Sequence, residues 1–233
     1  MIIFKILSYD SLVSTQAHAM NMVEQGGNHH GSVVHALHQT RGRGRLGRLW
    51  NSGQGNLCLS LIIQPQVLQE TWPQLTFVSS LAVAQTALNF IKDGKAIQIK
   101  WPNDILINGS KVAGILIDVV SDHVIIGFGI NIANAPNGCA YIGSGAEISE
   151  VRNVLLQQFE KFYQLWQNDQ WHDIKSMWET TAFPIGTPMV TTIKGIKRNI
   201  IYDGITHEGH LKYIDDAGHK HTMTAGDIFV EST

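Results

Sequence analysis

Residues 96–132 read AIQIKWPNDILINGSKVAGILIDVVSDHVIIGFGINI. Runs rich in isoleucine and valine recur through this segment, and they predict four strands, at 96–101, 104–107, 111–120 and 123–132. Asn108-Gly109 separates the two middle runs, and this dipeptide is a strong hairpin signal because both residues tolerate the positive φ angles of a tight turn. We therefore expect the segment to supply much of a β-sheet.

Helices and further strands are expected on both sides of this segment. Before it, strands are predicted at 2–7, 32–37 and 57–63, with helices at 14–25 and 73–91. After it, helices are predicted at 149–167 and 171–180. Ser14 and Ser149 are the expected N-caps of the helices that they precede. The fold class is therefore α+β, a mixed β-sheet flanked by helices.

The sequence pattern changes after Pro184. Residues 186–230 contain only short alternating runs, separated by turn dipeptides such as Asp203-Gly204. Such a pattern predicts a small five-stranded β-barrel. We therefore expect two domains, at 1–183 and 184–233.

Composition argues against a disulfide-stabilised, zinc-binding or membrane-spanning protein. A chain of 233 residues can bury a full core without disulfides, and its two cysteines, Cys58 and Cys139, show no paired spacing. This favours a reducing cytoplasm over a disulfide framework or a zinc site. Residues 71–91 carry no charge, but their glutamine, serine and asparagine side chains favour a buried core helix over a membrane span. The 11 histidines are scattered over turns and indicate surface residues.

Arginine is concentrated in one place. The chain has six arginines, and four of them lie in residues 41–48, interleaved with Gly42, Gly44 and Gly47. Guanidinium groups on a backbone that can approach a ligand closely indicate an anion site, above all for phosphate, although a solvated basic loop is the alternative. Because residues 39–56 lack apolar periodicity, we expect an irregular loop here.

Two known phosphate motifs do not apply to this loop. Residues 42–47 satisfy GxGxxG, but no helix is expected after them, and the first acidic residue that follows is Glu70. The Walker pattern GxxxxGK[ST] is absent. The loop therefore indicates a different kind of phosphate site.

A second constellation is KWPND at 100–104 together with KVAGILID at 111–118. Lys111 stands at a strand entrance, ahead of Gly114, where backbone or ligand can come close. Its ammonium could serve a carboxylate and a phosphate together, or it could be a solvated hairpin lysine. Asp104 could hold Mg²⁺ or a hydroxyl, or cap the turn after Pro102.

Taken together, these motifs resemble a known family. Ser14-Thr15-Gln16, Gln39 with GRGRLGRLW at 42–50, KWPND with KVAGILID, and GFGIN at 127–131 occur in the order and at the spacings of the biotin protein ligases. The resemblance implies a class II synthetase-like catalytic domain followed by an SH3-like barrel. It implies formation of biotinyl-5'-AMP from biotin and ATP, and then transfer of biotin to a lysine of a biotin carboxyl carrier protein.

The resemblance also implies roles for individual residues. Lys111 and Arg45 would be catalytic, Lys111 lying between the biotin carboxylate and the α-phosphate. Biotin would be bound by Ser14, Thr15, Gln16, Gln39, Gly42, Arg43, Gly44, Arg45, Lys111, Gly114 and Leu116. ATP or AMP would be bound by Arg45, Arg48, Trp50, Asn131 and Asp104, with Asp104 as a ligand of Mg²⁺. Two positions depart from the family pattern: Gln16 stands where Asn is common, and Asp118 where Glu is usual.

The resemblance leaves two rival functions and several expectations about partners. A lipoate or octanoate protein ligase has nearly the same chemistry, but its RRxSGGGAV-like loop is absent. An RNA-binding module would need a broad basic face, whereas the net charge is −2. Only about a dozen residues precede Ser14, so we expect a ligase without a DNA-binding domain, which binds neither DNA nor membranes and is a monomer or a weak homodimer.

Overall fold

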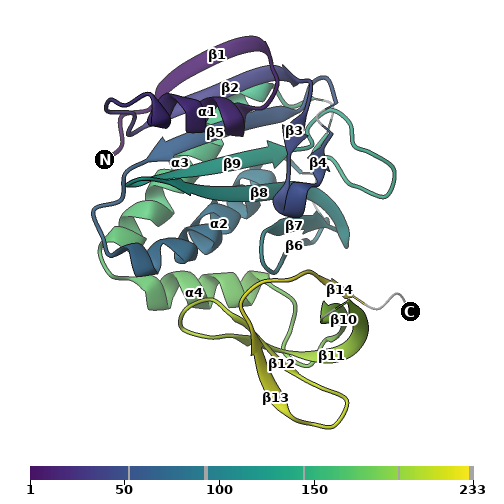
Figure 1. Ribbon diagram of the computed structural model, residues 1–233. Coiled ribbons are helices and arrows are strands. Elements are labelled where there is room, and N and C mark those ends of the chain that lie inside the picture. The colour runs from purple at the N-terminus through teal and green to yellow at the C-terminus, as the bar shows by residue number, and fades with distance from the viewer. Residues whose placement is uncertain (52, 92–93, 144, 194, 231–233) are drawn as a thin grey trace.

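The computed structural model describes residues 1–51, 53–91, 94–143, 145–193 and 195–230. A seven-stranded sheet forms its larger part (Figure 1), in the order β1-β2-β5-β9-β8-β7-β6. Its strands are β1 (Lys5–Leu12), β2 (Ser32–Gln39), β5 (Leu57–Ile63), β6 (Ile97–Lys100), β7 (Asp104–Ile107), β8 (Ser110–Val120) and β9 (His123–Ile130). β1 and β2 are parallel and the other neighbours are antiparallel, which confirms the predicted mixed sheet.

The segment at 96–132 forms four adjacent strands, as expected. β6, β7, β8 and β9 lie side by side in the sheet. Asn108 and Gly109 join β7 to β8 with φ angles of 48° and 78°, the positive values that a two-residue hairpin turn needs. This series of hairpins brings the KWPND and KVAGILID motifs next to each other, because Asp104 pairs with Gly114.

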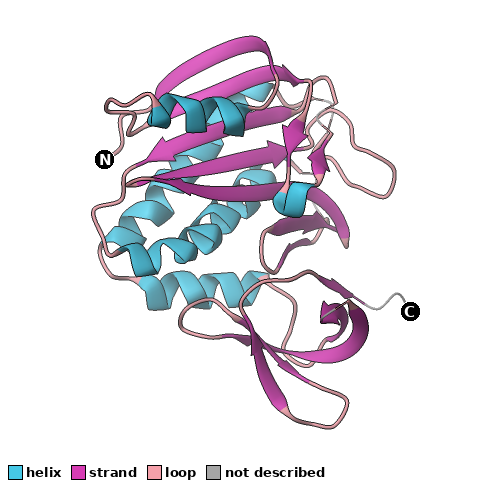
Figure 2. Cartoon of the chain, viewed as in Figure 1, coloured by secondary structure: helices cyan, strands magenta, loops and turns pink. Residues whose placement is uncertain are grey.

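Helices cover both faces of the large sheet (Figure 2). α1 (Thr15–Glu24) packs on one face, and α2 (Leu75–Phe90) and α3 (Ile148–Gln167) pack on the other. Neighbouring residues of a strand point to opposite faces, so Val33 joins the core under α2 while Val34 joins the core under α1. This explains why the central strands are apolar throughout: they are buried from both sides.

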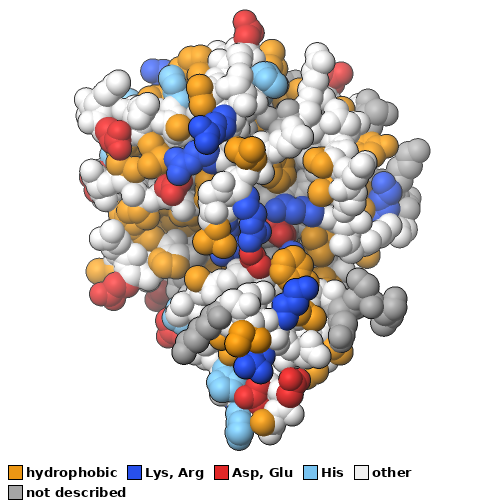
Figure 3. All heavy atoms as spheres, turned by 45° about the vertical axis from the view of Figure 1, so that its right-hand side comes forward, with side chains coloured by type: hydrophobic (Ala, Val, Ile, Leu, Met, Phe, Trp, Pro, Cys, Tyr) orange, Lys and Arg blue, Asp and Glu red, His pale blue; other side chains and the backbone are white. Residues whose placement is uncertain are grey.

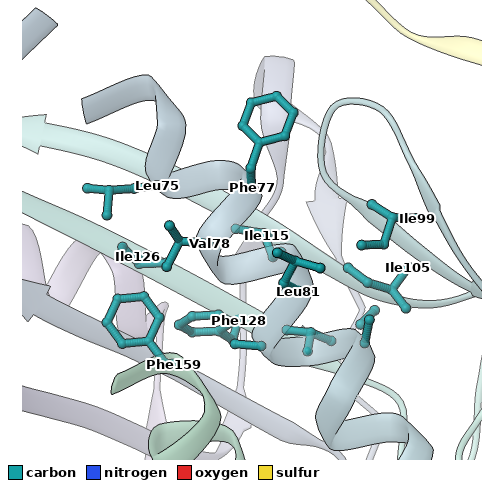
Figure 4. Packing of buried hydrophobic residues seen from close by; sticks show 14 of the residues in the cluster. Leu75, Phe77, Val78, Leu81, Ile99, Ile105, Ile115, Ile126, Phe128 and Phe159 are labelled. Atoms are coloured by element: carbon teal, nitrogen blue, oxygen red, sulfur yellow. The ribbon is translucent and has the colours of Figure 1, made fainter. Parts of the chain in front are cut away.

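The larger core lies between the sheet and the helices α2, α3 and α4 (Trp171–Thr181). In Figure 4, Val78 of α2 lies beside Ile126 of β9, and Phe128 of β9 lies next to Phe159 of α3. The last two rings meet edge to face, with centroids 6.1 Å apart. The expected uncharged helix is α2, preceded by a short 3-10 helix at Gln69–Gln74. Among the described residues, no helix is both long and apolar enough to cross a lipid bilayer.

The C-terminal part is a second sheet. Its strands are β10 (Pro188–Ile193), β11 (Ile196–Ile205), β12 (Leu211–Ile214), β13 (Lys220–Met223) and β14 (Ile228–Val230), in the order β13-β12-β11-β10-β14. The five expected strands are therefore present. Within the described residues no ladder joins β13 to β14, so backbone pairing does not close them into the expected barrel. The buried apolar side chains of this sheet join the larger core.

Two local expectations were wrong. Ser149 lies inside α3 and does not cap it, because the backbone is already helical at Ile148 and Glu147 holds the extended cap conformation. Residues 39–56 are not simply irregular: β3 (Gly42–Arg43) and β4 (Leu49–Trp50) pair around a 3-10 turn at Arg45–Gly47. Strands of two residues are too short to produce a periodic pattern. We call residues 42–50 the Arg-Gly hairpin.

Candidate active site

A cavity that is open to solvent lies between the Arg-Gly hairpin, the start of α1 and the strands β5, β8 and β9. It brings together most of the residues that the sequence singled out. Its lining includes Ser14, Thr15, Gln16, Gln39, Arg43, Gly44, Arg45, Arg48, Trp50, Asp104, Lys111, Gly114 and Leu116. Gly42 and Asn131 do not line it. The cavity thus collects residues from four separate motifs.

One end of the cavity is polar and uncharged. Ser14 caps α1 by accepting a hydrogen bond from the Ala17 amide, which places Thr15 and Gln16 in the first helical turn. Oε1 of Gln39 accepts hydrogen bonds from the amide (2.8 Å) and the hydroxyl (3.1 Å) of Thr15. Ser60 of β5 contacts both Thr15 and Gln16 through its hydroxyl, at 2.9 Å each. Thr15, Gln16, Gln39 and Ser60 are therefore joined in one hydrogen-bonded network that fixes their side-chain oxygens.

The opposite end is strongly charged. In Figure 3, Lys and Arg side chains gather around the middle of the face shown, with acidic atoms among them. Arg45 donates to Oδ1 of Asn103 at 3.0 Å and to the carbonyl of Gly226 at 3.2 Å. Arg45 and Arg48 both pair with the carboxylate of Asp227, which belongs to the C-terminal part of the chain. The Arg-Gly hairpin is therefore fastened to the C-terminal sheet next to the cavity.

Two lysines share the carboxylate of Asp104. Nζ of Lys111 lies 2.5 Å from Oδ1, and Nζ of Lys100 lies 3.0 Å from Oδ2. Because both oxygens face an ammonium group, Asp104 does not fit the role of a Mg²⁺ ligand in this arrangement. Among the described residues, no three His, Cys, Asp or Glu side chains come together in a way that could hold a metal ion. The geometry fits Asp104 as the residue that positions Lys111 at the cavity.

Glycines form the floor of the cavity. A Cβ at Gly129 would overlap the indole of Trp50, and a Cβ at Gly127 would lie 2.6 Å from Oε1 of Gln16. The Trp50 ring therefore lies flat against β9, and Nζ of Lys111 lies 5.6 Å from its centroid. The indole N–H of Trp50 is buried without a hydrogen-bond partner among the described residues.

The two predicted residues outside the lining lie behind it. A Cβ at Gly42 would come within 2.5 Å of the carbonyl oxygen of Trp50, so glycine is needed there for β3 and β4 to pair. Asn131 donates from Nδ2 to the carbonyl of Ala140 at 3.0 Å, and its Oδ1 is buried without a partner among the described residues. Asn131 does not line the cavity, and its contact with a nucleotide stays a prediction.

Several lining residues were not singled out from the sequence. Asn103 lies inside the KWPND motif, and Ser60 is the one hydroxyl in the apolar strand LCLSLII, so both carried a weak signal. Gly127 and Gly129 lie in the GFGIN motif. Asp227 carried no local signal, because its partner Arg45 is 182 residues away in the chain.

Comparison with known proteins places the chain among enzymes. The biotin/lipoate A/B protein ligase family matches residues 9–131. The bifunctional ligase/repressor BirA of Bacillus subtilis is 35% identical over 91% of this chain and 67% of its own length. The chain belongs to the biotin/lipoate A/B protein ligase family. The biotin--[acetyl-CoA-carboxylase] ligase of Paracoccus denitrificans, another relative, is 29% identical over 93% of this chain and 96% of its own length.

Solved structures agree with the fold that this family membership implies. The biotin protein ligase of Aquifex aeolicus, in complex with biotin and ATP, has a TM-score of 0.83 at 23% identity and covers 98% of this chain and 99% of its own. The biotin protein ligase of Leishmania major, in complex with biotinyl-5-AMP, has a TM-score of 0.67 at 25% identity and covers 94% of this chain and 98% of its own. The family fold therefore extends over the C-terminal sheet as well as the large one.

The glycine floor gives a first test of the site. We expect Gly129→Ala to weaken biotin binding about tenfold or more, because the new methyl group pushes Trp50 off β9 and into the cavity. Isothermal titration with biotin measures the effect. The control is Gly145→Ala, where a Cβ meets nothing within 4 Å. Equal biotin affinity in parent and Gly129→Ala would show that Trp50 does not shape the binding site.

Proposed function

We propose that this protein activates biotin with ATP to biotinyl-5'-AMP and then transfers biotin to a specific lysine of a biotin carboxyl carrier protein. The observation that carries the proposal is the polarity of the cavity, which is neutral and hydrogen-bonding at one end and cationic at the other. This suits biotin, which has an uncharged ureido ring at one end and a carboxylate at the other. The relatives named as biotin ligases support the same substrate.

The first step joins two anions. A carboxylate oxygen of biotin attacks the α-phosphorus of ATP, the P–O bond to the β-phosphate breaks, and pyrophosphate leaves. Lys111 and Arg45, fixed by Asp104 and Asn103, offset the repulsion between the carboxylate and the phosphate and stabilise the charge that develops on the phosphoryl oxygens. Arg48, Trp50 and Asn131 complete the proposed nucleotide side of the site.

The second step needs no nucleophile from this chain. The ε-amine of the carrier lysine attacks the acyl carbon of biotinyl-5'-AMP, an amide bond forms, and AMP leaves with the bonding electrons. The cavity is open to solvent, which gives the lysine a route to the acyl carbon. A cytoplasmic location and a monomeric or weakly dimeric state complete the proposal.

The test is direct. Purified protein is incubated with radiolabelled biotin, ATP and Mg²⁺, which usually accompanies nucleoside triphosphates, and the products are separated by thin-layer chromatography. We expect biotinyl-5'-AMP, and its disappearance when a biotin carboxyl carrier domain is added. Parallel incubations contain lipoate or octanoate. An adenylate formed with lipoate and not with biotin would overturn the proposal in favour of the other branch of the family.

A further inference from the structure

Gln16, which lines the cavity, is hydrogen-bonded to Asp118, which does not. Gln16 is only 3% exposed, and its carboxamide lies between α1 and the sheet. Nε2 donates to Oδ2 of Asp118 at 2.9 Å and to the carbonyl of Ile125 at 3.1 Å. Oε1 accepts from the hydroxyl of Ser60 at 2.9 Å. Asp118 lies on β8, half-buried, and does not line the cavity.

These contacts permit only one orientation of the Gln16 amide. An ionised carboxylate and a backbone carbonyl accept hydrogen bonds and donate none. If the amide were turned by 180°, Oε1 would face the oxygens of Asp118 and Ile125 with no hydrogen between them, which is costly in a buried site. Asp118 and the carbonyl of Ile125 together therefore keep Oε1 of Gln16 turned toward Ser60 and the cavity.

The fixed amide sets the polarity of the neutral end of the cavity. Oε1 of Gln39 is likewise fixed, because it accepts from the backbone amide of Thr15, and this leaves the Gln39 NH₂ group without a hydrogen-bond partner among the described residues. A ligand therefore meets donors from Gln39 and acceptors from Gln16 and Ser60. A neutral group that carries both C=O and N–H, such as a cyclic urea, matches this pattern.

We infer that Asp118 is a positioning residue for the neutral ring of the substrate, acting through Gln16 without touching the ligand. The inference rests on the proposed function and deepens it. The reacting carboxylate lies at the other end of the cavity, near Lys111 and Arg45, so Asp118 governs the binding of biotin and leaves the chemical step and ATP binding alone.

Steady-state kinetics of adenylate formation, with biotin and ATP varied separately, test this inference. We expect Asp118→Leu to raise KM for biotin about tenfold, with kcat and KM for ATP within about threefold of the parent. Asp118→Asn retains an oxygen that can accept from Nε2 of Gln16, so we expect a KM for biotin within about threefold. If Asp118→Leu lowered kcat and raised both KM values by similar factors, Asp118 would have a merely structural role. That result would overturn the inference.

A second test exchanges the side-chain lengths at positions 16 and 118, and it does not depend on the folding of Asp118→Leu. Gln16→Asn shortens one side chain by one methylene group and breaks the contact, whereas Gln16→Asn combined with Asp118→Glu restores the total length. We expect the single variant to raise KM for biotin and the double variant to recover most of the loss. A double variant no better than Gln16→Asn refutes the coupling. Failure of the proposed function differs, because the parent itself would then form no biotinyl-5'-AMP.

Discussion

Replacing Lys111 with alanine is expected to slow the formation of biotinyl-5'-AMP by about 100-fold or more and to leave the fold intact. Lys111 places its ammonium at the cavity, held 2.5 Å from Asp104, and one preorganised charge at a developing anion commonly stabilises a transition state by about 3 kcal/mol. The side chain is 34% exposed, so its loss removes little buried packing. Stopped-flow measurement of pyrophosphate release gives the rate of the first step.

The control for this prediction is Lys175→Ala. Lys175 is also ion-paired, to Glu179 on α4, and it does not line the cavity, so its loss should change the rate less than threefold. Unfolding curves of both variants check that the fold persists. A rate within threefold of the parent for Lys111→Ala would remove this lysine from the mechanism.

Replacing Trp178 with alanine is expected to lower the free energy of unfolding by about 3–5 kcal/mol. The Trp178 side chain on α4 is 0% exposed, and its indole N–H donates to the hydroxyl of Ser80 at 3.0 Å. Its ring meets Phe77 of α2 edge to face, with centroids 5.1 Å apart. Trp178 also borders a small void shared with Met189 and Ile228 of the C-terminal sheet. Its loss therefore leaves a cavity where two helices and that sheet meet.

Urea denaturation followed by circular dichroism measures this loss. Trp178→Phe, which keeps an aromatic ring but has no N–H group, should destabilise the protein by a clearly smaller amount. Trp178 does not line the active-site cavity, so the folded alanine variant should still form the adenylate at low temperature. A loss below about 1 kcal/mol would show that the surrounding side chains fill the space.

Short-range patterns in the sequence predicted most of the helices and strands. The strands at 96–132 are specified by short-range signals: β-branched runs and one Asn-Gly turn that needs positive φ angles. The N-cap at Ser14 was equally local and is present, whereas Ser149 showed that a suitable residue near a helix start does not fix where the backbone turns helical. Closure of the C-terminal sheet depends on pairing between its first and last strands in the sheet, which no short window of sequence encodes.

The site residues that belong to sequence motifs could be predicted. Those that reach the site through long-range contacts could not. Lys111, Arg45 and Gln39 were recognised from their motifs, and the structure places all three on one cavity. Asp227 had no pattern of its own. The Gln16–Asp118 contact is a further case: each residue stood out as a departure from the family pattern, but only the structure shows that the two side chains are hydrogen-bonded to each other across 102 residues.

The bond between Arg45 and Asp227 also has a consequence for the time course of biosynthesis. The ribosome makes the carboxylate partner of Arg45 182 residues after Arg45 itself. At about 5–20 residues per second, that delay is roughly 10–40 s. During this interval the large sheet can form, while the Arg-Gly hairpin has no anchor in the C-terminal sheet. A nascent chain should therefore acquire its full anion-binding capacity only after Asp227 has been made.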